Sequence, residues 1–188
     1  QLLLSVEQVI PVKEAEDYMI SVAKKNKEDK EDQSQRSSVH RQRKEFWGEL
    51  LDKINQTENN RFQNISPSKD QWLQSSAGVG GISYTFGVSK TYARVEFTLA
   101  RPKAKENKFF FDELYKQKEL IEESFGYPLE WERLDGKKMA RVKYEKKDVN
   151  FYDKDDWPAM IDFLVGFMPK MEKAFSAHLK KAAQKFKT

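Results

Sequence analysis

The chain has 188 residues, of which 34 are basic and 30 acidic, giving a net charge of +4, and 38% are hydrophobic. This length suits one domain with an appendage and allows a substantial core, to which the thirteen phenylalanines and four tryptophans contribute most. With no cysteine and two histidines, the composition excludes disulfides, thiol nucleophiles and thiolate metal sites, and it disfavours a zinc centre or a histidine-driven triad.

The weak positive charge permits nucleic acid as a partner but does not require it. No apolar run approaches the length of a membrane span, and no leader peptide is recognisable. We therefore expect a cytoplasmic protein with no membrane partner. The composition implies no cofactor and no metal.

The N-terminal part of the chain is predicted to be the tail of an upstream domain, so that the sequence is a piece of a longer protein. Residues 2–10 alternate like a short strand without a nearby strand partner, and a helix is predicted over residues 13–25. Residues 24–43 are a mixed-charge run with almost no apolar side chain, which is typical of a linker or a solvated helix. This predicts a tail of residues 1–37 and an α+β domain of residues 38–188.

The α+β domain is predicted to begin with a helix over residues 40–56, capped by Ser37 or Ser38, because its apolar residues recur at helical spacing. Residues 72–73 begin a candidate first strand. A glycine-rich turn at residues 77–81 then leads into the first hairpin.

Two amphipathic hairpins are predicted to form most of the sheet. The first pairs residues 82–88 with residues 93–99, where apolar and polar side chains alternate with a period of two. The second pairs residues 129–134 with residues 140–144 around an Asp-Gly turn, which is a strong hairpin signal.

Two further helices follow the hairpins. One is predicted over residues 106–125 and ends at Gly126, and the last is predicted over residues 155–184 with Asp155 or Asp156 as its cap. We therefore expect an α+β fold. Its mainly antiparallel sheet contains the two hairpins plus one or two extra strands, and about three helices pack on one face.

Two patterns have both a chemical and a structural interpretation. Residues 78–81 resemble a phosphate cradle, but they lack the Lys-Ser/Thr ending of a P-loop and precede a strand, so a turn that needs positive φ explains them better. Glu130 and Glu132 resemble a paired acid-base site. Because Arg141 and Lys143 lie opposite them in the predicted hairpin, cross-strand ion pairs are the better interpretation.

A metal nuclease of the restriction type needs an Asp and a Glu-x-Lys on adjacent strands. Glu145-Lys-Lys147 has that spacing and Asp135 lies upstream, so an enzyme in its own right would depend on Glu145. Asp135 belongs to the predicted hairpin turn, however, and such triplets are expected by chance in a chain rich in Glu and Lys. We predict no catalytic residue and no metal ligand in this fragment.

Basic residues gather on the predicted polar face of the sheet and after the first hairpin, where they suit a surface that contacts phosphates. The same residues also suit a solvated rim. The candidate nucleic-acid-binding residues are Arg94, Arg101, Lys103, Lys105, Lys108 and Arg141.

A set of aromatic, glycine and proline positions extends over about residues 41–183: Phe46-Trp47, Ser66-Pro67, Trp72-Leu73, Gly78 with Gly80-Gly81, Ala93-Arg-Val-Glu96, Asn107-Lys108, Ile121-Glu122, Phe125-Gly126, Leu129-x-Trp131 and Trp157-Pro158. Together these positions resemble a prokaryotic family of domains of unknown function found C-terminal to restriction-endonuclease-like (PD-(D/E)XK) nuclease domains. The family has no established catalytic residues.

The resemblance implies that residues 2–10 are the last strand of an upstream nuclease-like domain and residues 11–37 a connector. It implies a non-catalytic accessory module that contacts or positions nucleic acid within a DNA-processing or genome-defence protein, whose full-length form would be the metal-dependent nuclease. The alternative is a structural or dimerisation module without nucleic-acid contact. Its homodimer interface would be the methionine-rich final helix or the polar face of the sheet.

Overall fold

The computed structural model describes residues 13–187, and its contacts divide the chain into two units, residues 1–41 and residues 42–188, each of which is described by itself. The strand predicted at residues 2–10 lies outside the described residues. Among the described residues, no helix is long and apolar enough to cross a membrane.

The described part of the first unit is helical and belongs to α1 (Lys13–Ile54). The mixed-charge run is therefore a solvated helix rather than an irregular linker, because Lys, Glu and Gln favour helix and ion pairs such as Lys27 to Glu31 (3.9 Å) support it. The prediction that Ser37 or Ser38 begins a helix is wrong. Ser37 lies inside α1, where its hydroxyl donates to the carbonyl of Gln33 at 2.8 Å.

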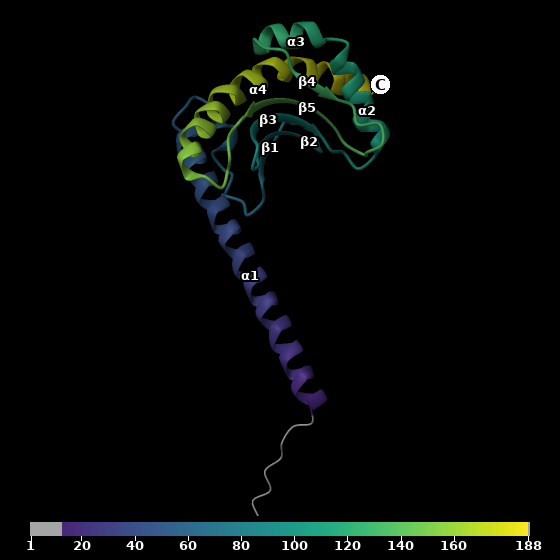
Figure 1. Cartoon of the computed structure of the whole chain (residues 1–188). Helices are drawn as coiled ribbons and strands as arrows, with labels where there is room; N and C mark the ends of the chain where they lie inside the picture. The colour runs from purple at the N-terminus through teal and green to yellow at the C-terminus, as the bar shows by residue number, and fades with distance from the viewer. Residues whose placement is uncertain (1–12, 188) are drawn as a thin grey trace, which may run out of the picture. The chain divides into compact units, whose positions relative to one another are not determined.

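The second unit contains a five-stranded antiparallel sheet in the order β1-β2-β3-β5-β4, which confirms the predicted fold class (Figure 1). Its two hairpins lie side by side because β3 pairs with β5. The extra strand predicted at residues 72–73 is present at one edge of the sheet. The strands are β1 (Trp72–Ser76), β2 (Ile82–Val88), β3 (Tyr92–Leu99), β4 (Glu130–Glu132) and β5 (Ala140–Lys147).

Helices pack on the apolar face of this sheet, which is convex, and α4 arcs along it (Figure 1). The helix predicted over residues 106–125 is two helices, separated where the amide of Gln117 donates to the carbonyl of Leu114 at 2.9 Å. On the two sides of the break, α2 contacts α4, β5 and β3, and α3 contacts α4. The elements after the first hairpin are α2 (Ala104–Tyr115), α3 (Lys118–Phe125), η2 (Lys154–Asp156) and α4 (Trp157–Lys187), and η1 (Asn60–Phe62) precedes the sheet.

The ends of two helices test the predicted caps. Gly126 follows α3 with φ of +93°, as predicted for a left-handed C-cap. Before α4, the capping carboxylate is that of Asp153 rather than Asp155 or Asp156, because Asp153 accepts a hydrogen bond from the amide of Asp155 at the start of η2. The short 3-10 turn therefore moves the cap upstream.

The core lies between the convex face of the sheet and the helices. Phe97 of β3 stacks on Phe175 of α4 with ring centroids 4.4 Å apart. The methionines of α4, at positions 160, 168 and 171, are fully buried in the same core. The expectation of a homodimer interface on a methionine-rich face of the last helix therefore loses its basis, because those side chains are not at the surface.

Candidate functional site on the concave face of the sheet

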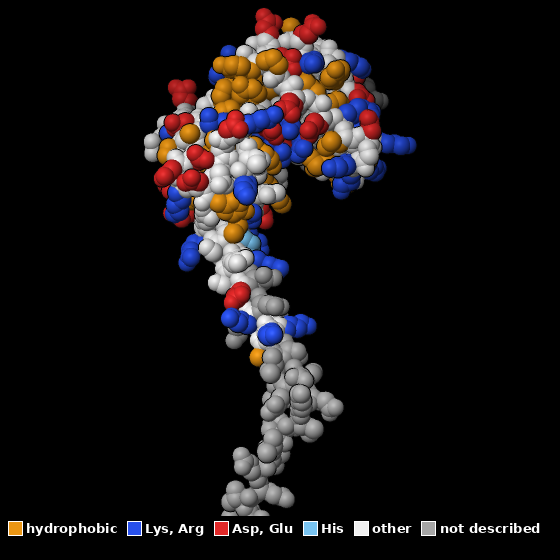
Figure 2. Space-filling view, viewed as in Figure 1, with side chains coloured by type: hydrophobic (Ala, Val, Ile, Leu, Met, Phe, Trp, Pro, Cys, Tyr) orange, Lys and Arg blue, Asp and Glu red, His pale blue; other side chains and the backbone are white. Residues whose placement is uncertain are grey.

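The concave face of the sheet carries the polar residues of the alternating strands and forms a groove of about 440 Å³. Acidic and basic side chains are interspersed in a band below the helical layer, where β4 and β5 lie in Figure 1 (Figure 2). Since the apolar residues of each strand are committed to the core, their neighbours in sequence are directed into this groove. The concave face is the candidate functional site.

The register arranges these outward residues in three rows across the strands. The rows are numbered from the N-terminal end of β3. The first row is Trp72, Gly87, Arg94 and Glu145, and the second is Gln74, Thr85, Glu96, Lys143 and Glu130. The third row is Ser76, Ser83, Thr98, Arg141 and Glu132.

Seven charged side chains of these rows form a connected network, here called the charge ladder: Arg94, Glu96, Glu130, Glu132, Arg141, Lys143 and Glu145. Lys143 is its centre, with Nζ 2.7 Å from Glu145 Oε1, 3.2 Å from Glu130 Oε2 and 3.5 Å from Glu132 Oε1. The predicted cross-strand pairing of the hairpin carboxylates is confirmed.

The two arginines link the ladder across β3 and β5. The Nη1 atom of Arg141 lies 3.5 Å from Glu96 Oε2, and its Nε donates to Glu132. Arg94 lies between Glu96 (3.0 Å) and Glu145 (3.5 Å). Because the ladder holds three cations and four carboxylates, its formal charge is −1.

The ion pairs favour the charged forms of Glu132 and Lys143. Burial opposes the charged form of Glu132, but the hydrogen bond and charge of Arg141, with help from Lys143, outweigh it and lower the pKa of this carboxyl. Burial likewise disfavours the charged form of Lys143, but the hydrogen bonds that its ammonium donates to Glu145 and Glu130 raise its pKa overall. The pairs are therefore mutually stabilised rather than poised to exchange protons.

The first row has a distinct composition, because it brings flat side chains together. Gly87 has no side chain, and a Cβ there would lie 3.1 Å from Arg94 Nε, so the glycine leaves room for Arg94 to lie across β2. The guanidinium carbon of Arg94 is 4.8 Å from the ring centroid of Tyr92. On the other side of Gly87, Trp72 is 47% exposed although it is a large aromatic residue.

Exposed lysines lie beyond both ends of the groove. β3 and β5 have eight residues each, so the two ends are separated by about 25 Å. Among the described residues no ion pair is formed by these lysines, which are Lys90 and Lys147 at one end and Lys103, Lys105, Lys137 and Lys138 at the other.

The structure distributes the six predicted nucleic-acid-binding residues over three environments. Arg94 and Arg141 lie on the concave face, in the charge ladder. Lys103 and Lys105 are solvent-exposed, just after Ala100, which lines the groove.

The other two predicted residues make intramolecular contacts that support the fold. Lys108 donates to the carbonyls of Arg133, Leu134 (2.9 Å) and Met139 (2.8 Å), so it organises the loop between β4 and β5, and burial lowers its pKa. Arg101 donates to Glu106 at 2.8 Å and to the carbonyl of Gly80 at 2.7 Å.

Sequence reasoning did not include Trp72 and Tyr92 among the site residues. The available signal was alternation: Leu73 is buried, so Trp72 must be directed to the opposite face. Tyr92 precedes the buried Ala93 in the same way.

The glycine-rich turn is explained by its backbone. Gly78 and Gly81 have φ of +90° and +74°, and a Cβ on Gly81 would lie 2.7 Å from the Cα of Arg101. The interpretation as a positive-φ turn is confirmed.

The residues of the nuclease-like triplet are not brought together. Asp135 lies in the loop before β5 and pairs with Arg133. Glu145 lies near the other end of β5 and accepts from Lys143 at 2.7 Å. Within residues 13–187, no three His, Asp or Glu side chains form a group that could hold a metal ion.

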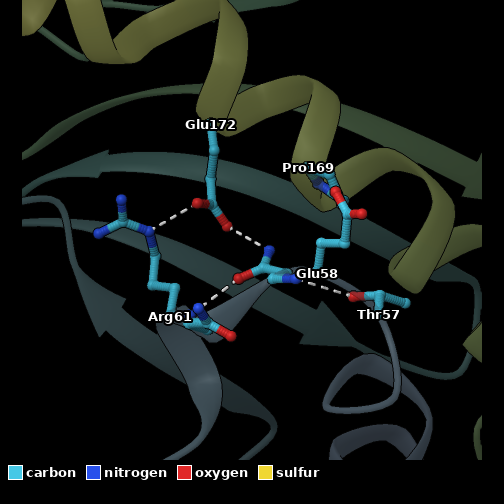
Figure 3. A pocket seen from close by; sticks show the side chains of 7 residues that line it. Thr57, Glu58, Arg61, Pro169 and Glu172 are labelled. Carbon is cyan, nitrogen blue, oxygen red and sulfur yellow. Dashed lines mark hydrogen bonds and ion pairs between the residues drawn. The ribbon is translucent and has the colours of Figure 1, made fainter.

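A second cavity, of about 750 Å³, lies between the turn at residues 57–61 and α4 (Figure 3). Both carboxylate oxygens of Glu172 are used there: Oε1 accepts from Asn59 Nδ2 at 2.6 Å and Oε2 from Arg61 Nε at 2.7 Å. Because these groups satisfy one another, they fasten the turn to α4, and the concave groove stays the stronger candidate.

The fold and the site together define a class: a small α+β domain whose sheet is covered by helices on one face and presents a charged groove on the other. The chain belongs to the family described as domain of unknown function DUF4268, whose profile matches residues 42–179. No curated protein and no solved structure matches it.

Proposed function

We propose that residues 42–187 form a non-catalytic accessory module that contacts or positions nucleic acid with the concave face of its sheet. The observation that carries this proposal is the groove itself, in which Arg94 and Arg141 lie with Trp72 and Tyr92 between lysine-bearing ends. Basic groups that contact phosphates, combined with flat side chains that stack on bases, are the general requirements for binding nucleic acid.

The lysines at the two ends have a different role from the arginines in the middle. Lys103 and Lys105 are exposed and carry no ion pair within the described chain, so they can neutralise phosphates without breaking a contact. Arg94 and Arg141 are already paired with carboxylates, which hold them in place and moderate their attraction for phosphate. This division predicts moderate affinity that depends strongly on salt.

The cellular setting that we propose is a DNA-processing or genome-defence protein of restriction type, in which an upstream nuclease-like domain is the partner of this module. The resemblance of residues 41–183 to domains found C-terminal to such nucleases supports this setting. In that arrangement catalysis belongs to the upstream domain, and residues 42–187 hold the substrate.

The test is the affinity of the chain for labelled oligonucleotides over a series of salt concentrations, measured by fluorescence anisotropy. We expect the logarithm of the affinity to fall linearly with that of the salt concentration, and Lys103→Ala and Lys105→Ala each to reduce the slope by about 1. Arg94→Ala and Arg141→Ala are expected to weaken binding as well. The matched control is Lys173→Ala, an exposed lysine of α4 on the helical side.

Absent or salt-independent binding would contradict the proposal. Light scattering on the same variants tests the alternative function. If Arg94→Ala and Arg141→Ala change the oligomeric state and leave nucleic-acid affinity unchanged, the concave face is an interface between copies of the chain.

A further inference from the structure

The first row of the concave face and the neighbouring Tyr92 of β3 place three groups with flat, polarisable faces at one end of the groove: the indole of Trp72, the guanidinium of Arg94 and the ring of Tyr92. All three line the groove, although aromatic residues in this fold are otherwise used mainly in the core. An indole that is 47% exposed presents a flat apolar face on which a planar ring can stack. This end of the groove is therefore suited to a planar ring.

The charge of the groove bears on the form of the nucleic acid. A duplex presents its phosphates outward and keeps its bases stacked inside, so its binding relies on a strongly positive surface. The charge ladder has a formal charge of −1, and its arginines are shared with carboxylates. A surface of this kind attracts a duplex poorly, whereas a single strand offers unpaired bases that stack on aromatic and guanidinium faces.

We infer that the concave face binds a single strand of nucleic acid. One unpaired base stacks on the flat groups around Trp72, and the phosphates on either side of that base lie toward the exposed lysines. This inference rests on the proposed function and names its substrate class. Stacking uses the face that every base has, so the site accepts different bases at this position.

Gly87 is the residue that gives the site its shape. A Cβ at this position would lie 3.1 Å from Nε and 3.2 Å from Cγ of Arg94, so even a methyl group makes the arginine shift, and a β-branched side chain would push it away from its place over β2 beside Tyr92. The backbone of Gly87 does not have positive φ, so the requirement is for space rather than for backbone conformation.

The experiment compares three fluorescein-labelled probes of equal length with the wild-type chain: oligo-thymidine, the corresponding duplex, and an abasic strand that has the same phosphates without bases. We expect the oligo-thymidine strand to bind roughly ten times more tightly than either of the others, the effect of one stacked base. Trp72→Ala is expected to reduce single-strand affinity to the abasic level, and Trp72→Phe to restore most of it.

The matched control is Tyr127→Ala. Tyr127 is 45% exposed, close to the 47% of Trp72, but it packs against Phe167 of α4 on the helical side. Gly87→Val is the second variant, and it is expected to weaken single-strand binding without changing the binding of the abasic probe.

Two outcomes separate this inference from the proposed function. If the duplex or the abasic strand binds as tightly as oligo-thymidine, the single-strand inference is overturned while nucleic-acid contact stands. If none of the three probes binds, both fail.

Discussion

The two faces of the sheet are built from the same five strands but are stabilised in different ways. On β3, Val95 and Phe97 are directed into the core, while Arg94 and Glu96 are directed into the groove. The convex face is stabilised by apolar contacts with the helices, and each of these contacts involves only the side chains that touch. The concave face is held by charges that share partners across several strands.

Because of this difference, the two faces respond differently to amino-acid substitution. A core side chain that is truncated leaves a cavity, and the loss is large and nearly independent of distant residues. A ladder side chain that is removed leaves its partners uncompensated, so its effect depends on which neighbours remain. Function is accordingly expected on the concave face, where polar groups are held in place without helices packed over them.

The largest effect is expected from the convex face. Phe97→Ala removes a fully buried ring that stacks on Phe175 and contacts Tyr84, and it should lower the free energy of unfolding by about 3–5 kcal/mol. Urea denaturation measures this. The control is Gln74→Ala, an exposed position on the opposite face, and an equal loss in both variants would contradict the comparison.

An intermediate effect is expected at the centre of the ladder. Lys143→Ala removes the cation shared by Glu130, Glu132 and Glu145. It should cost about 2 kcal/mol, because the Glu145 side chain is only 8% exposed and loses its hydrogen-bond donor.

A double-mutant cycle makes this prediction sharper. Adding Glu145→Gln to Lys143→Ala neutralises a stranded carboxylate, so the double variant should be more stable than the sum of the single changes predicts. Lys147→Ala, at the exposed end of the same strand, should change stability by less than about 0.5 kcal/mol. Additive single changes would show that the ladder is not coupled.

The smallest effect is a pH dependence. The pKa of Glu132 is below its ordinary value of 4.5 in the folded chain, so the unfolded chain binds more protons as the pH falls through this range. The stabilisation is therefore complete above pH 4.5 and is lost as the pH drops through the lower folded value. Since surface pairs contribute about 1 kcal/mol or less, the change is small.

The measurement is the difference in unfolding free energy between the wild type and Glu132→Gln from neutral to acid pH. We expect this difference to shrink on acidification, because the wild type loses the ion pair with Arg141 that the variant never had. If the difference in unfolding free energy does not change with pH, the substitution acts through the shape of the side chain rather than through its charge.

Much of the fold followed from local pattern, and the exceptions have local reasons. Alternation predicted β2, β3 and β5, and the glycine at 126 predicted the end of α3. The break at Gln117 was missed because the apolar spacing continues across it, although in the structure the amide of Gln117 donates to the carbonyl of Leu114. Ser37 was assigned as a cap because its type favours that position, but in the structure it donates to a carbonyl within α1.

The candidate site was predictable only in part. Arg94 and Arg141 could be assigned to the polar face from alternation, and both are there. The role of Lys108 as a donor to three carbonyls could not be predicted, because its acceptors lie in a loop more than twenty residues away in sequence. The adjacency of Trp72, Gly87 and Arg94 required the pairing of β1, β2 and β3.

By itself, the sequence determined which side of each strand is apolar, because side-chain direction alternates along an extended chain whatever it packs against. Only the tertiary structure decided which polar residues share a row, because register and strand order depend on contacts between segments far apart in sequence. The charged groove is a product of that second step.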